Sequence, residues 1–115
     1  MEEQKDVLIE VCKIYKDEED VFRGFLNDRN FIGKWNFGKK NPKEPDLRLY
    51  YEDLNGGWEK QDFLSLWLKK STTGREYFIG NRDGITYIGL IRFNRMSEEE
   101  PFIILNYVIK IRRDY

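Results

Sequence analysis

The residue types that most often carry catalysis are scarce in this chain of 115 residues. It has no histidine, which removes the commonest general base and the commonest metal ligand. Cys12 is the only cysteine and lacks a base to activate it, so we expect it to be packed in a core. No glycine-rich phosphate loop with its lysine is present. These observations predict a protein that is not an enzyme and that uses no cofactor.

Pro45-Asp46 is the pair most similar to a catalytic motif. In some nucleases a Pro-Asp pair on a strand is completed by an acid, one residue and a lysine, which together hold a metal ion. The strand that should supply the second half reads Leu66-Trp67-Leu68-Lys69-Lys70 and has no carboxylate. Pro and Asp are common where a turn leads into a strand, so we interpret Asp46 in that way.

The acidic run Asp17-Glu18-Glu19-Asp20 raises the question of a cation site. Calcium loops space their oxygen ligands at alternating positions around a glycine, and this run does not. Consecutive acids suit the start of a helix, where the helix dipole is positive. Glu98-Glu99-Glu100 is interpreted as a solvated loop, and no metal site is predicted.

The middle of the chain combines aromatic rings with positive charge. If the leucines at 47, 49, 64, 66 and 68 face a core, the opposite face of these strands gathers rings and cations. Rings on which bases stack, beside cations that neutralise phosphates, are what single-stranded nucleic acid requires. Tyrosine and tryptophan would stack, and arginine and lysine would meet phosphates. The predicted binding residues are Arg48, Tyr50, Trp67, Lys69, Arg75 and Tyr77, with Lys34 and Arg92 as neighbours.

The same rings also suit protein packing. Trp67 or Tyr77 would equally serve beneath the N-terminal segment, in a homodimer or against another protein. The alternative function is therefore a protein-interaction module or inhibitor from a phage or plasmid that docks on a host protein. Its acidic N-terminal third would then be a docking surface.

The elements that carry these residues are mostly β-strands. Residues 6–16 are β-branched and apolar, which favours a strand. A helix competes, because one helical stripe contains Leu8, Val11, Tyr15, Phe22 and Phe25. We expect a strand there, followed by a short helix over residues 18–27 with Asp17 as its N-cap. Further strands are predicted at 31–37, 46–53, 62–70, 75–80, 85–94 and 102–112. Six or seven strands at this spacing predict a small, partly open antiparallel barrel of the oligonucleotide-binding kind.

Composition and charge bound the chain as one folded domain. Its length suits a single domain over residues 1–115, and its aromatic content of 16% is typical of a folded protein. Residues 1–30 carry a net charge of −4, residues 31–95 carry +4 and residues 96–115 carry −1. No apolar run is long enough for a membrane span, and the charged N-terminus does not resemble a secretion signal. A cytoplasmic protein is expected.

Two stretches resemble a small uncharacterised family found in bacteria, plasmids and phages. They are Glu44-Pro45-Asp46-Leu47-Arg48-Leu49-Tyr50 and the segment from Trp67 to Tyr77, which reads WLKKSTTGREY. The family pattern looks like Pro-Asp-aromatic-Arg-aliphatic-aromatic, followed by a Trp-Lys-Lys hairpin that ends in Tyr. Leu47 and Leu68 depart from it, where an aromatic residue and a lysine are usual. The resemblance implies a compact β domain from a mobile element and supplies no catalytic residue.

Overall fold

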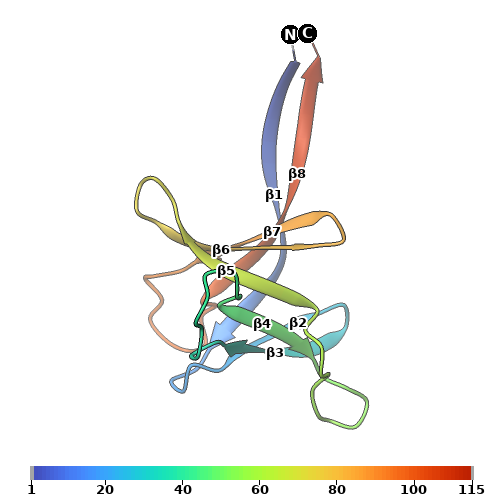
Figure 1. Ribbon diagram of the computed structural model, residues 1–115, viewed down its shortest axis with the longest axis vertical. Helices are drawn as coiled ribbons and strands as arrows, with labels where there is room; N and C mark the ends of the chain where they lie inside the picture. The colour runs from blue at the N-terminus through green and yellow to red at the C-terminus, as the bar shows by residue number, and fades with distance from the viewer. Residues whose placement is uncertain (1, 115) are drawn as a thin grey trace.

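The computed structural model describes the chain from residue 2 to residue 114 and the side chains of residues 6–110. The ends of the predicted domain, residues 1 and 115, lie outside the described residues. Eight antiparallel strands follow one another around a closed barrel, and the last strand pairs with the first (Figure 1). They are β1 (Glu2–Lys16), β2 (Phe22–Leu26), β3 (Arg29–Trp35), β4 (Leu47–Tyr51), β5 (Leu64–Lys70), β6 (Glu76–Arg82), β7 (Ile85–Ile91) and β8 (Ile103–Asp114).

The predicted mostly-β barrel is confirmed, but four of its details are wrong. The described chain has eight strands rather than six or seven, and the barrel is closed rather than partly open. Its strands neighbour one another in chain order, which is an up-and-down arrangement and not that of an oligonucleotide-binding fold. The fourth error is the N-terminal helix.

No helix forms over residues 18–27. The Asp17 carboxylate accepts hydrogen bonds from the backbone N–H groups of Glu19 (2.9 Å) and Val21 (3.0 Å), which closes a tight turn instead of capping a helix. Asp20 has a φ of 60°, in the left-handed region, and cannot continue a helix there. The chain then enters β2, where Phe22 is buried and Phe25 is exposed. Residues 6–16 form part of β1, as expected.

Alternating side chains build the core of the barrel. Leu47, Leu49 and Tyr51 of β4 are buried, as predicted. In β5, Leu64 and Leu66 are buried as predicted, whereas Leu68 is half-buried. Register explains the buried leucines, because Leu47 lies opposite Leu66 and Leu49 opposite Leu64. The largest fully buried side chains are Ile14, Phe31, Leu47, Leu49, Leu66, Phe78, Ile103 and Leu105.

Strands β1 and β8 are longer than the barrel is tall. Their register shifts between Glu10 and Cys12, so Val11 is an extra residue in a β-bulge. On one side of the bulge, Cys12 and Ile14 pair with β8 inside the barrel. On the other side, the two strands continue as a paired ribbon that leaves the barrel and places Glu2 opposite Asp114 (Figure 1). The molecule therefore measures 53 × 32 × 32 Å.

Candidate nucleic-acid interface

The six predicted binding residues lie on the outer side of the barrel or in an adjoining turn. Arg48 and Tyr50 alternate with the buried residues of β4, and Trp67 and Lys69 follow the buried leucines of β5. Tyr77 neighbours buried Phe78 in β6, and Arg75 stands in the turn before that strand. The three cations are exposed, whereas the three rings are half-buried.

The structure divides these residues into two groups. In the first group, Lys34 lies opposite Arg48, and its Nζ stands 5.1 Å from the ring centroid of Tyr50. In the second group, Lys69 lies opposite Tyr77, and Trp67 is diagonal to that tyrosine. Leu66 pairs with Leu47, so Trp67, the next residue of β5, lies one residue beyond Leu47 on the side away from Tyr50. Tyr50 and Trp67 are therefore four residues apart along the strand direction, which is about 13 Å. The rings therefore do not form one continuous platform.

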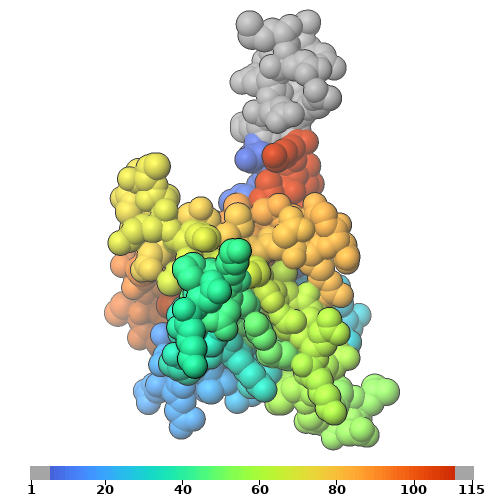
Figure 2. Space-filling view, in the orientation of Figure 1, coloured from blue at the N-terminus to red at the C-terminus, as the bar shows by residue number. Residues whose placement is uncertain are grey.

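Trp67 anchors the loop between β3 and β4. Its indole Nε1 donates a hydrogen bond to the carbonyl oxygen of Lys43 at 3.1 Å. At the end of the same loop, the Asp46 carboxylate accepts from the backbone N–H of Leu68 (2.8 Å) and from Lys39 Nζ (3.1 Å). Residues 36–46 are thus held across the outside of β5, where they form the teal-to-green segment at the front of Figure 2. The hydrogen bond between Trp67 and the loop was not predicted from the sequence, and it engages the indole N–H of Trp67.

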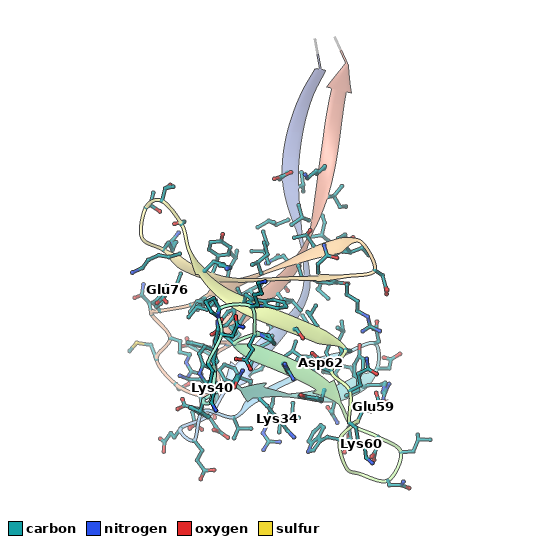
Figure 3. All side chains as sticks on the ribbon, in the orientation of Figure 1. Lys34, Lys40, Glu59, Lys60, Asp62 and Glu76 are labelled. Carbon is teal, nitrogen blue, oxygen red and sulfur yellow. The ribbon has the colours of Figure 1, made fainter. Side chains whose placement is uncertain are left out.

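The loop and the strands beside it together concentrate positive charge on one side of the barrel. Residues 34–48 and 65–77 contain eight basic and three acidic residues, a net charge of +5, whereas the whole chain is −1. Two of the acids are engaged within the loop, because Asp46 pairs with Lys39 and the Glu44 carboxylate accepts from the backbone of Lys40. Figure 3 labels Lys34 and Lys40 on this side. We define the basic face as Lys34, Lys40, Lys43, Arg48, Lys69 and Arg75, all of which are exposed.

A hollow adjoins the basic face on the outside of β6 and β7. Its volume is about 400 Å³, and its walls are mostly apolar, with Arg75 and Tyr77 beside them. Leu8 and Leu90 in these walls are 40% and 43% exposed. A planar, partly apolar group such as a base could rest here against a ring, with a guanidinium close by. The remaining lining residues are Ser71, Glu76, Ile88 and Ile91. Arg92, proposed as a neighbour of the site, follows the end of β7 and is not part of the basic face.

The thiol of Cys12, the only cysteine in the sequence, is unreactive at neutral pH. Burial raises the pKa of the Cys12 thiol to about 11, and the negative charge of Glu10 adds to this effect. The thiol is therefore protonated at neutral pH and is a poor nucleophile. Among the described side chains, no three His, Cys, Asp or Glu residues gather as they would around a metal ion.

Two further findings concern membrane-spanning helices and similarity to known proteins. Between residues 2 and 114 there is no helix long and apolar enough to cross a membrane. No protein-family model, curated protein or solved structure matches the sequence or the fold.

Proposed function

We propose that this protein is a non-catalytic binding protein for single-stranded nucleic acid and that the basic face is its binding surface. The observation that carries the proposal is the net charge of +5 in residues 34–48 and 65–77 of a chain that is otherwise acidic. Phosphate contacts dominate the affinity of nucleic-acid-binding proteins, and they need such a local excess of cations.

Each group of residues has a distinct role in this proposal. Lys34 and Arg48, side by side on β3 and β4, would meet one stretch of phosphates, and Lys69 and Arg75 would meet the next. Tyr77 would offer its ring to a base that enters the hollow outside β6. Only an unpaired base can enter such a hollow, which favours a single strand over a duplex. Trp67 would act indirectly by holding the lysine-rich loop in place.

The second candidate function is protein binding on the outer side of β6, β7 and β1. Leu8 and Leu90 are large apolar side chains, are at least 40% exposed and line the same hollow. Apolar patches of this kind commonly mark protein interfaces. A host protein or a second copy of the chain would cover this surface without any need for the cations of the basic face.

Fluorescence anisotropy with labelled single-stranded and duplex oligonucleotides tests the proposal. Affinity for the single strand should fall about 50-fold between about 50 and 200 mM salt if about four phosphates are contacted. Replacing both Arg48 and Lys69 with glutamine should weaken binding and lower the salt slope by about 1.4, because two phosphate contacts are lost.

Lys60→Gln is the matched control, since Lys60 is an exposed lysine in the connection between β4 and β5, away from the basic face (Figure 3). It should leave the affinity within about twofold of wild type. Equal binding of the double variant and wild type, or absence of binding at low salt, would refute the nucleic-acid function and favour the protein partner.

A further inference from the structure

One end of the barrel opens into an aromatic cavity of about 250 Å³. This end is formed where β1, β3, β5 and β7 finish and where β2, β6 and β8 begin, so residues far apart in the sequence meet there. An eight-stranded barrel is wide enough to hold one small ligand. The residues that surround the cavity are Lys16, Asp20, Phe22, Trp35, Phe37, Leu68, Glu76, Phe78, Ile91, Phe93 and Phe102.

The walls are built from packed rings. Phe22 stacks beside Trp35 with ring centroids 6.3 Å apart, and Phe78 meets Trp35 edge-on at 6.1 Å. Phe22 and Phe78 are buried and form the inner part of the cavity. At the rim, Phe37 and Phe93 are 80% and 61% exposed, although exposing large rings to water is unfavourable. Exposed rings around an apolar cavity are typical of a surface that receives a ligand.

One of these rings, Phe102, already attracts cations within the protein. Lys16 Nζ stands 4.5 Å from the ring centroid of Phe102, and the guanidinium of Arg95 stands 5.2 Å from the same centroid. The negative face of an aromatic ring stabilises such positive charges, and the effect grows when water is excluded. The ring of Phe102 at the mouth of the barrel therefore already interacts with positive charge.

The charged residues that line the cavity are one cation, Lys16, and two acids, Asp20 and Glu76. Lys16 is neutralised by Asp20 at 3.3 Å. Glu76 is the second carboxylate, and it shares the inward side of β6 with buried Phe78. Lys70 lies opposite Glu76 in the ladder, yet no ion pair joins them among the described side chains. Figure 3 labels Glu76 at the start of β6. Glu76 is thus a half-buried acid at the edge of the aromatic cavity, and it also borders the hollow outside β6 and β7.

We propose that this cavity binds a small organic cation, an ammonium group carrying an apolar or aromatic body. The body would displace water from the rings, and the ammonium would lie between their faces and Glu76. A cavity of about 150 Å³ is known to accommodate benzene, so the volume here suffices for one ring with an ammonium substituent. The site lies at one end of the barrel and shares Glu76 with the hollow outside β6 and β7, but it needs none of the cations of the basic face.

The test titrates three probes of similar size into the full ¹⁵N-labelled chain and follows the indole N–H resonance of Trp35. The probes are benzyltrimethylammonium, the neutral alcohol 2-methyl-1-phenylpropan-2-ol and the anion phenylacetate. We expect the cation to shift the Trp35 resonance at millimolar or lower concentration. It should bind at least about fivefold more tightly than the alcohol, and phenylacetate should bind most weakly.

Glu76→Gln should lower the affinity for the cation about tenfold and leave that for the alcohol unchanged. Glu10→Gln is the control, because Glu10 is an exposed acid on β1 outside the cavity, and it should change neither affinity. Phe93→Ala, at the exposed rim, should lower the affinity for the cation about threefold. The proposal is overturned if the alcohol or the anion binds as tightly as the cation, or if no probe shifts Trp35. The comparison of probes on wild type decides the matter even if the Glu76 variant does not fold.

Discussion

Asp46 links the long loop to β5 through both its carboxylate and its backbone. It accepts from the backbone of β5 at Leu68 and from Lys39 in the long loop, and its own backbone N–H donates to the Leu66 carbonyl at 2.9 Å. The side chain of Asp46 is only 14% exposed, so these bonds form largely away from water. A charged acceptor in this setting contributes more than a neutral one, and the loop depends on it for its position.

Replacing Asp46 with alanine should lower the free energy of unfolding by about 1–3 kcal/mol, because the Leu68 N–H and the Lys39 ammonium lose their acceptor. Urea unfolding of the variant and of wild type measures this difference. Glu99→Ala, which changes an exposed acid in the loop before β8, is the control and should stay within about 0.5 kcal/mol of wild type. Equal stability of the Asp46 variant and the control would show that the carboxylate does not hold the loop.

Cys12 gives a second prediction, on the pH dependence of stability. Its pKa rises from 9.0 in the unfolded chain to about 11 in the barrel, so the folded state holds the proton more tightly. The resulting stabilisation is fully present below pH 9 and is lost as the pH rises through about 11. Between these values wild type should lose about 2 kcal/mol more than Cys12→Ala. Unfolding free energies of both proteins across this range test the point, and parallel curves would contradict it.

At the scale of the strands, alternation was a reliable guide where one face of a strand is buried. The inward leucines of β4 and β5 were predicted because every second residue is apolar. Strand β2 was missed because Phe22 and Phe25 also fit a helical stripe and follow an acidic run. The turn that decides between the two depends on the Asp17 side chain, which local propensity describes poorly.

Long-range contacts account for the other differences. Barrel closure requires the first strand, β1, to pair with the last strand, β8. The position of the bulge at Val11 sets where the ribbon leaves the barrel. The outward side of the candidate interface followed from alternation, but the loop over Trp67 depends on tertiary hydrogen bonds. The aromatic cavity draws its rings from separate strands and from loops, so no spacing in the sequence indicates it.

The close contact between β5 and β6 yields a prediction at this scale. A Cβ atom on Gly80 would lie 2.2 Å from the backbone oxygen of Ser65, which cannot move aside as a flexible side chain would. Gly80→Ala should therefore destabilise the barrel by about 1–3 kcal/mol. A Cβ on Gly38 meets nothing within 4 Å, so Gly38→Ala is the matched control and should be neutral or slightly stabilising. Thermal unfolding compares the two, and similar melting temperatures would refute the close-packing argument.

At the scale of the whole molecule, the barrel separates two surfaces of different chemistry. The basic face lies outside, across β3 to β5 and the loop that covers them, whereas the aromatic cavity opens at one end. With +5 in residues 34–48 and 65–77, the rest of the chain carries −6. Such a division of charge would orient the protein on a polyanion, with its acidic surface turned away.

The central claim, that the basic face binds single-stranded nucleic acid, is tested most directly by a nuclear magnetic resonance titration of the ¹⁵N-labelled protein with an unstructured oligonucleotide at low salt. We predict shifts at the backbone amides of β3, β4 and β5 and of the loop over residues 36–46, and at the indole of Trp67. These shifts should disappear when the salt is raised. Shifts confined to the ribbon of β1 and β8 or to the aromatic cavity, or no shifts at all, would contradict the account.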